Sequence, residues 1–166
     1  MAKRAILRFP DARLRMAAET IAVFDGALAA LADDLTSAMR AAPGIGITAP
    51  HIGVLQRLVA IEFPAADRVR IYVNPRIEWA SAALARHEEG SVSMPGVTEI
   101  VERPACVRVA FQNLTGAPRV EEADGLLAVC LQHEIDQLDG MFWIQRLSKL
   151  KRDRLVRRFE KMGRPG

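Results

Sequence analysis

Apolar residues recur with helical spacing in three segments of the chain. In the first, residues 24–39, the pattern ends at Pro43-Gly44, so we expect a helix that stops there. The second runs from about 125 to 138 and is apolar around most of its circumference, which predicts a buried helix capped by Asp124. The third, 148–162, places Leu150, Leu155, Phe159 and Met162 against the body and its charges outside, as in an amphipathic terminal helix.

Between the first two helices the chain has the pattern of β-strands. Residues 57–63 and 70–74 are rich in β-branched and aromatic residues, and Pro75 is expected to end the latter. Residues 107–111 alternate with period two before a turn at 113–116, after which 118–122 can return as the second strand of a hairpin. This order predicts a single α+β domain over residues 1–166, with antiparallel strands around a central buried helix and a C-terminal helix.

The composition is that of an ordinary globular protein. The 166 residues are 50% hydrophobic and 26% charged, and no apolar run has the length of a membrane span or a signal peptide. The two cysteines, Cys106 and Cys130, lie in apolar surroundings and imply no disulfide framework. We therefore expect a cytoplasmic protein.

The net charge of +3 is unevenly distributed. Residues 146–164 contain nine Lys or Arg and two acids, a net +7, so the rest of the chain carries −4. The basic terminal helix has two interpretations. It can be a solvated face that aids solubility, or it can attract a polyanion such as RNA. Because its apolar side is needed for packing, membrane binding is not expected.

The candidate chemistry begins on the second helix, which reads His133-Glu134-Ile135-Asp136-Gln137. Residues i and i+4 share one helical face, so a metallohydrolase would carry histidine at both ends and use the adjacent Glu for proton transfer. Here the fifth position is Gln137. Polar groups on a buried helix must find partners, so these side chains are expected to be hydrogen bonded.

Three segments together resemble the peptide deformylase family. That family carries Gly-x-Gly-x-Ala-Ala-x-Gln, Glu-Gly-Cys-x-Ser and His-Glu-x-x-His motifs. This chain has Gly44-Ile-Gly-Ile-Thr-Ala-Pro-His51, Glu89-Gly-Ser-Val-Ser93 and the helix motif above, in the same order. The resemblance extends over nearly the whole chain and implies a peptide-deformylase-like fold.

The resemblance also implies roles for individual positions. The family's three metal ligands correspond to Ser91, His133 and Gln137, its formyl-oxygen Gln to His51, and its general acid/base to Glu134. The implied substrate class is the formyl-methionyl N-terminus of peptides. The residues expected to line the peptide groove are Ile45, Gly46, Gly90, Val92 and Leu126. Because the family works on nascent chains, it also implies a ribosome contact through the basic helix 148–162.

Two of the three ligand positions carry weak donors, a neutral hydroxyl at Ser91 and an amide at Gln137. Bound zinc lowers the pKa of water from 15.7 to roughly 7, on the order of 12 kcal/mol of help, whereas a general base offers about 10²–10⁴-fold. We therefore expect no bound cofactor, and ordinary metal-dependent deformylation to be lost or strongly reduced. A bound metal, if any, would be Fe(II), Zn(II) or Ni(II).

Three uses of such a site stay open at this point. Ser91, His133, Glu134 and Gln137 can form a closed polar cluster beside a groove that still binds peptide N-termini, which gives a catalytically inactive binding protein. Alternatively, His51, His133 and Glu134 can form a rebuilt metal site of an active hydrolase. In the third, Ser91 acts as a nucleophile beside His133 without a metal.

Overall fold

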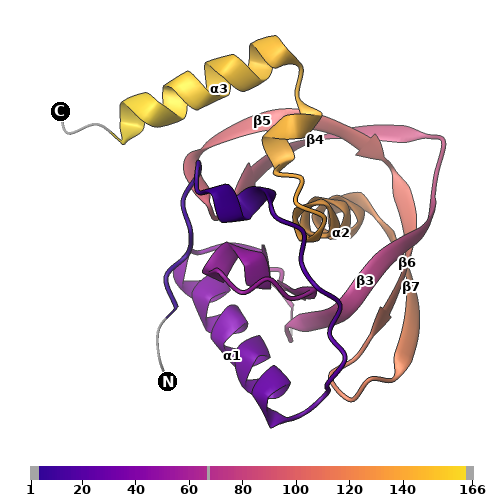
Figure 1. Cartoon of the computed structure of the whole chain (residues 1–166). Coiled ribbons are helices and arrows are strands. Elements are labelled where there is room, and N and C mark those ends of the chain that lie inside the picture. The colour runs from indigo at the N-terminus through magenta and orange to yellow at the C-terminus, as the bar shows by residue number, and fades with distance from the viewer. Residues whose placement is uncertain (1–3, 67, 164–166) are drawn as a thin grey trace.

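The computed structural model describes residues 4–66 and 68–163, and Figure 1 shows their arrangement. The helices are α1 (Gly26–Ala41), α2 (Gly125–Leu138) and α3 (Lys149–Met162), with short 3₁₀ helices η1 (Ala12–Arg15), η2 (Ala49–Ile52) and η3 (Trp143–Arg146). The strands are β1 (Gly46–Thr48), β2 (Leu58–Ile61), β3 (Arg70–Ala80), β4 (Leu84–Ser91), β5 (Met94–Pro104), β6 (Cys106–Gln112) and β7 (Pro118–Asp124). No helix in this described part is long and apolar enough to cross a membrane.

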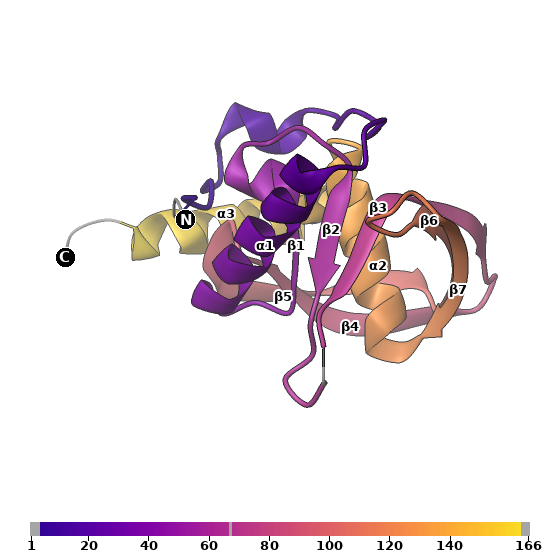
Figure 2. The ribbon, with the colours of Figure 1, turned by 90° about the horizontal axis from the view of Figure 1, so that it is seen from below.

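The strands form two antiparallel sheets around α2. One sheet has the order β1-β2-β3-β6-β7, and the other is the β4–β5 pair. Figures 1 and 2 show α2 in the middle of the molecule, with α1 on one side and β6 and β7 on the other. The expected α+β class, with antiparallel strands around a central helix, is confirmed.

Helix α2 is the centre of the core. Ten of its 14 residues are buried, among them the polar Gln132, His133, Glu134 and Gln137. The helix begins directly after β7, and Gly125 makes the transition with φ +53°, in the left-handed region that favours glycine. Asp124 occupies the N-cap position, but the expected side-chain bond is absent. Its side chain is exposed, so water solvates the carboxylate instead.

Strand β3 differs from the prediction, because it continues through Pro75 to Ala80. Asn74 takes φ 52°, and the β3–β6 register shifts between Val73 and Arg76. Asn74 is held there by its side chain, which accepts from Ile21 N and donates to Ile21 O. A proline at such a bulge removes no ladder hydrogen bond, so the strand need not end.

Helix α3 packs through fewer residues than expected. Ser148 caps its first turn by accepting from Lys151 N, and Leu155 and Phe159 are buried. Leu150 and Met162 were expected against the body but are 60% and 56% exposed. Figure 1 shows α3 crossing one edge of the molecule, with its C-terminal end extending past the body.

Candidate functional site

A pocket of about 440 Å³ lies between the start of β1, the turn that joins β4 to β5, and α2. All five residues expected to line a peptide groove border it: Ile45, Gly46, Gly90, Val92 and Leu126. Ser91, His51, His133 and Glu134 border it as well. Gln137 is not among its lining residues, so the fold brings together nine of the ten positions that the sequence indicated.

Glu134 lies deep in this pocket, packed against the backbone of β1. A Cβ on Gly46 would lie 2.6 Å from Glu134 Oε2, so this close approach requires glycine. Glu134 Oε1 is buried and has no hydrogen-bond partner among the described residues. Burial raises the pKa of the carboxyl to about 7, although nearby His133 opposes the shift. Glu134 therefore holds or gives up a proton close to neutral pH.

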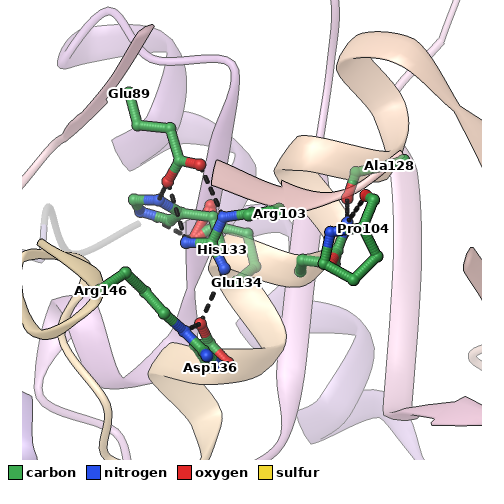
Figure 3. Close-up of polar contacts among 9 residues, drawn as sticks. Glu89, Arg103, Pro104, Ala128, His133, Glu134, Asp136 and Arg146 are labelled. Atoms are coloured by element: carbon green, nitrogen blue, oxygen red, sulfur yellow. Dashed lines mark hydrogen bonds and ion pairs between the residues drawn. The ribbon is translucent and has the colours of Figure 1, made fainter. Parts of the chain in front are cut away.

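A buried ion-pair network holds His133 through its Nδ1 nitrogen. Its Nδ1 lies 2.8 Å from Glu89 Oε1, and Arg103 binds both oxygens of Glu89 at 2.6 and 2.9 Å. Arg103 also donates to Asp136, which in turn accepts from Arg146 (Figure 3). Burial opposes the charge on Glu89, but the bonds from His133 and Arg103 outweigh it and lower its pKa to about 2. Glu89 is thus a carboxylate that accepts from His133 Nδ1–H.

The free side of the His133 ring faces Glu134. His133 Nε2 lies 4.0 Å from Glu134 Oε1, which is beyond hydrogen-bond distance. Burial opposes a positive charge on His133, but Glu134 and Glu89 outweigh it and raise its pKa. Sequence reasoning missed Arg103 in this network. Its own neighbours, Val101-Glu102-Arg103-Pro104, carry no local signal of this pairing.

Gln137 points away from the pocket and binds the backbone of another segment. Its Nε2 donates to Leu14 O at 2.7 Å, and the side chain is 1% exposed. Because a carbonyl oxygen can only accept, the amide nitrogen of Gln137, and not its oxygen, must face Leu14. The side chain at this family ligand position therefore ties α2 to η1.

Ser91 is also engaged with the backbone. Its Oγ accepts from Ser93 N at 3.1 Å, and within the described residues no hydrogen bond joins Ser91 to His133. The expected closed cluster of Ser91, His133, Glu134 and Gln137 is therefore wrong. Three of these side chains bind separate partners outside the set, because backbone groups and Glu89 lie closer to them, and Glu134 Oε1 has none.

His51 is held by Thr48 at the other wall of the pocket. Thr48 N donates to His51 Nδ1 at 2.9 Å, and Thr48 Oγ1 lies 2.9 Å from the same nitrogen. Burial, with a smaller contribution from His133, lowers the pKa of His51 to about 3, so the ring is neutral. His51 Nε2 is buried without a partner in the described structure. Thr48 was missed from the sequence, although a Thr three residues before a polar residue is a capping signal.

No metal set forms from the acidic, histidine and cysteine side chains of the described residues. No group of three or more of them is arranged to hold an ion. The proposed rebuilt site of His51, His133 and Glu134 is thereby not supported, because Thr48 N–H occupies the lone pair of His51 Nδ1. That leaves the neutral ring with its proton on Nε2.

Comparison with known proteins agrees with the geometry. A family model described as polypeptide deformylase matches residues 3–153. The chain belongs to the peptide deformylase family. It is 63% identical over 164 residues to a protein of Rhizobium meliloti named "Peptide deformylase-like", covering 99% of this chain and 95% of that one. It is 43% identical to a protein of Afipia carboxidovorans named "Peptide deformylase", covering 97% and 96%.

The fold agrees at the level of solved structures too. The crystal structure of a peptide deformylase from Legionella pneumophila superimposes with a TM-score of 0.92 at 37% identity, covering 99% of this chain and all of that chain. The peptide-deformylase-like fold is thus confirmed. The family usually binds a divalent metal ion, and the donors that this chain offers do not fit one. A hydroxyl bound to the backbone, one imidazole and an amide turned towards Leu14 cannot replace a thiolate and two imidazoles.

Proposed function

We propose that this protein binds peptide N-termini of the formyl-methionyl class in the pocket beside α2, without ordinary metal-dependent deformylation. The observation that carries the proposal is the bond from Gln137 Nε2 to Leu14 O. It gives one metal-ligand position of the family a structural role while the pocket itself stays open. The bond to Leu14 thus accounts for the expected loss of metal binding at position 137 and leaves the pocket free for a ligand.

The edge of the large sheet supports peptide binding. Strand β1 is the terminal strand of the five-stranded sheet, and its first residue, Gly46, borders the pocket. An extended peptide can add to such an edge through backbone hydrogen bonds, while its side chains enter neighbouring depressions. Gly44 and Gly46 keep this wall low, since a Cβ at either would meet a neighbouring side chain at 2.6 Å.

The polar groups in the pocket support an N-acylated end. His51 Nε2 and Glu134 Oε1 are both buried and unpartnered among the described residues. A formamide offers a carbonyl acceptor on one edge and an N–H donor on the opposite edge, so one ligand group can satisfy both. Leaving such groups unpaired costs about 1–3 kcal/mol each, which a suitable ligand recovers.

The active-hydrolase alternatives have less support. A serine nucleophile needs a hydrogen bond to its base, and Ser91 Oγ instead accepts from Ser93 N. Glu134 is suited to proton transfer near neutral pH, but a general base alone contributes about 10²–10⁴-fold, far less than a metal-activated water. The site is therefore better suited to hold a peptide than to cleave it.

Calorimetric titration with formyl-methionyl-alanyl-serine tests this function, with formate release measured in the same samples. We expect saturable binding and little or no formate. Gly46→Ala should weaken binding strongly, because its Cβ collides with Glu134 Oε2. Gly26→Ala is the matched control, since a Cβ there meets nothing within 4 Å. Rapid formate release, or equal binding by both variants, would overturn the proposal.

A further inference from the structure

A second cavity, of about 470 Å³, lies between α3, the segment that leads into η1, and the residues of and next to η3. It shares no lining residue with the pocket beside α2. Its volume is within the range of small-molecule sites in proteins, about 300–1,000 Å³. The proposed peptide binding does not involve this cavity, so its own chemistry decides what it can hold.

The floor of the second cavity is apolar and is held in place. It consists of aromatic and aliphatic side chains from all three segments: Phe9, Leu14, Phe142, Ile144 and Val156. The rings of Phe9 and Phe142 stack with their centroids 5.6 Å apart. Phe9 N donates to Ser93 O at 2.8 Å, and Leu14 O accepts from Gln137 Nε2. Because both segments are anchored, the floor is formed before a ligand binds, and it favours an apolar group.

Arginines predominate on the rim of this cavity. Helix α3 contributes Arg152 and Arg157, and η1 contributes Arg15. Arg152 Nη1 donates to Gln145 Oε1 at 3.4 Å, so this side chain reaches from α3 to η3. The wall formed by α3 also belongs to the basic segment 146–164, which carries a net +7. The electrostatic potential at the rim is therefore expected to be positive.

The acids on the rim do not cancel this charge. Asp11 binds Arg13 at 2.8 Å, and Asp153 lies 3.2 Å from Lys149, and neither of these bases lines the cavity. Glu160 is the one other acid among the lining residues. Three arginines therefore face one remaining carboxylate, which leaves an excess of two positive charges at the rim.

We propose that the second cavity binds a small organic anion with an apolar body, of the class of medium-chain carboxylic acids. The apolar chain lies on the floor, and the carboxylate lies at the rim, where a guanidinium offers two parallel N–H donors. A neutral ligand of the same shape leaves these donors without an anion, and a cationic ligand is repelled by them. The charge of the head group therefore determines the selectivity.

Calorimetric titration with three eight-carbon ligands that differ in charge tests the proposal: octanoate, octanamide and octylamine. We expect octanoate to bind most tightly and octylamine least. The affinity for octanoate should fall as salt is added, because the rim is open to solvent. Equal affinity for octanoate and octanamide, or no binding of octanoate, would overturn the proposal.

Two substitutions on α3 distinguish a local site from general attraction to the basic helix. Arg152→Gln removes an arginine of the rim and should weaken octanoate binding roughly 3–10-fold, the usual net worth of one hydrogen bond. Arg154→Gln makes the same change in charge at a residue that does not line the cavity, so the affinity should stay nearly the same. Equal losses for the two variants would show diffuse attraction to α3 and refute the site.

The position of the ligand is tested with Val156→Phe, whose larger side chain fills part of the cavity floor. Octanoate binding should be lost in this variant. Unchanged binding would place octanoate elsewhere, the pocket beside α2 included, and would refute the proposal. Self-association in sedimentation equilibrium that Val156→Phe abolishes, together with no octanoate binding by the unmodified protein, would show that a second copy of the chain occupies the cavity instead.

Discussion

Replacing Gln137 with leucine removes the bond that joins α2 to η1 while keeping a side chain of similar size. Leu14 is 1% exposed, so its carbonyl loses the donor at 2.7 Å and water cannot easily take its place. A buried polar group left unpaired costs about 1–3 kcal/mol. For a domain of this size each kcal/mol shifts the melting temperature by roughly 2–4 °C. The variant should therefore melt about 2–12 °C below the unmodified protein.

Urea unfolding followed by circular dichroism measures the underlying loss in the free energy of unfolding, about 1–3 kcal/mol, with Gln56→Leu as the matched control. Gln56 is exposed, so its replacement should change the free energy of unfolding by no more than about 0.5 kcal/mol. The same curves recorded with a chelator should not move for the unmodified protein. A bound metal at a thousandfold excess over its dissociation constant would add about 4 kcal/mol. The reasoning is refuted if Gln137→Leu is as stable as Gln56→Leu, or if the chelator destabilises the unmodified protein.

Two further predictions concern the buried charges and His51. Arg103→Met removes the buried partner of Glu89 and Asp136 and should lower the free energy of unfolding in urea by about 3–5 kcal/mol. The control Arg86→Met breaks an exposed pair with Glu102 and should lower it by at most about 1 kcal/mol. Similar losses for both variants would contradict the burial argument. The folded pKa of His51 lies near 3, below its ordinary value of 6.5, so the unfolded chain binds a proton first and stability falls as the pH drops below 6.5. Between pH 7.5 and 5 the unmodified protein should lose about 2 kcal/mol more than His51→Gln, and parallel pH profiles would show that His51 is not buried neutral.

The fold was largely predictable because its signals are local. The α2 boundaries follow from the apolar pattern that begins after Asp124 and ends at Asp139-Gly140, and the structure places the helix at Gly125–Leu138. The end of β3 was not predictable in this way. Pro75 normally ends a strand, but here Asn74 is held by Ile21, which lies 53 residues away along the chain. Tertiary contacts of this kind leave no local pattern.

For the candidate site, too, the position of the residues was predictable and most of their hydrogen-bond partners were not. The pocket was predictable because the family resemblance implied that the motif residues lie together at one site, and nine of them line the same pocket. Their hydrogen-bond partners did not follow, because Gln137 binds a carbonyl 123 residues away and His133 binds Glu89 at a separation of 44. The one partner within reach of sequence reasoning was Thr48, three residues before His51. That pair was readable as a capping signal, whereas the neutral state of the ring follows from its burial.

The most direct test of the central claim is the affinity for formyl-methionyl-alanyl-serine with and without a metal. The protein is treated with a chelator, and the peptide is titrated before and after one equivalent of ferrous or zinc ion is added back. We expect the same dissociation constant in all samples and no burst of formate, because Gln137 is bound to Leu14 and His51 Nδ1 to Thr48. Binding or formate release that appears only after the metal is restored would contradict the account.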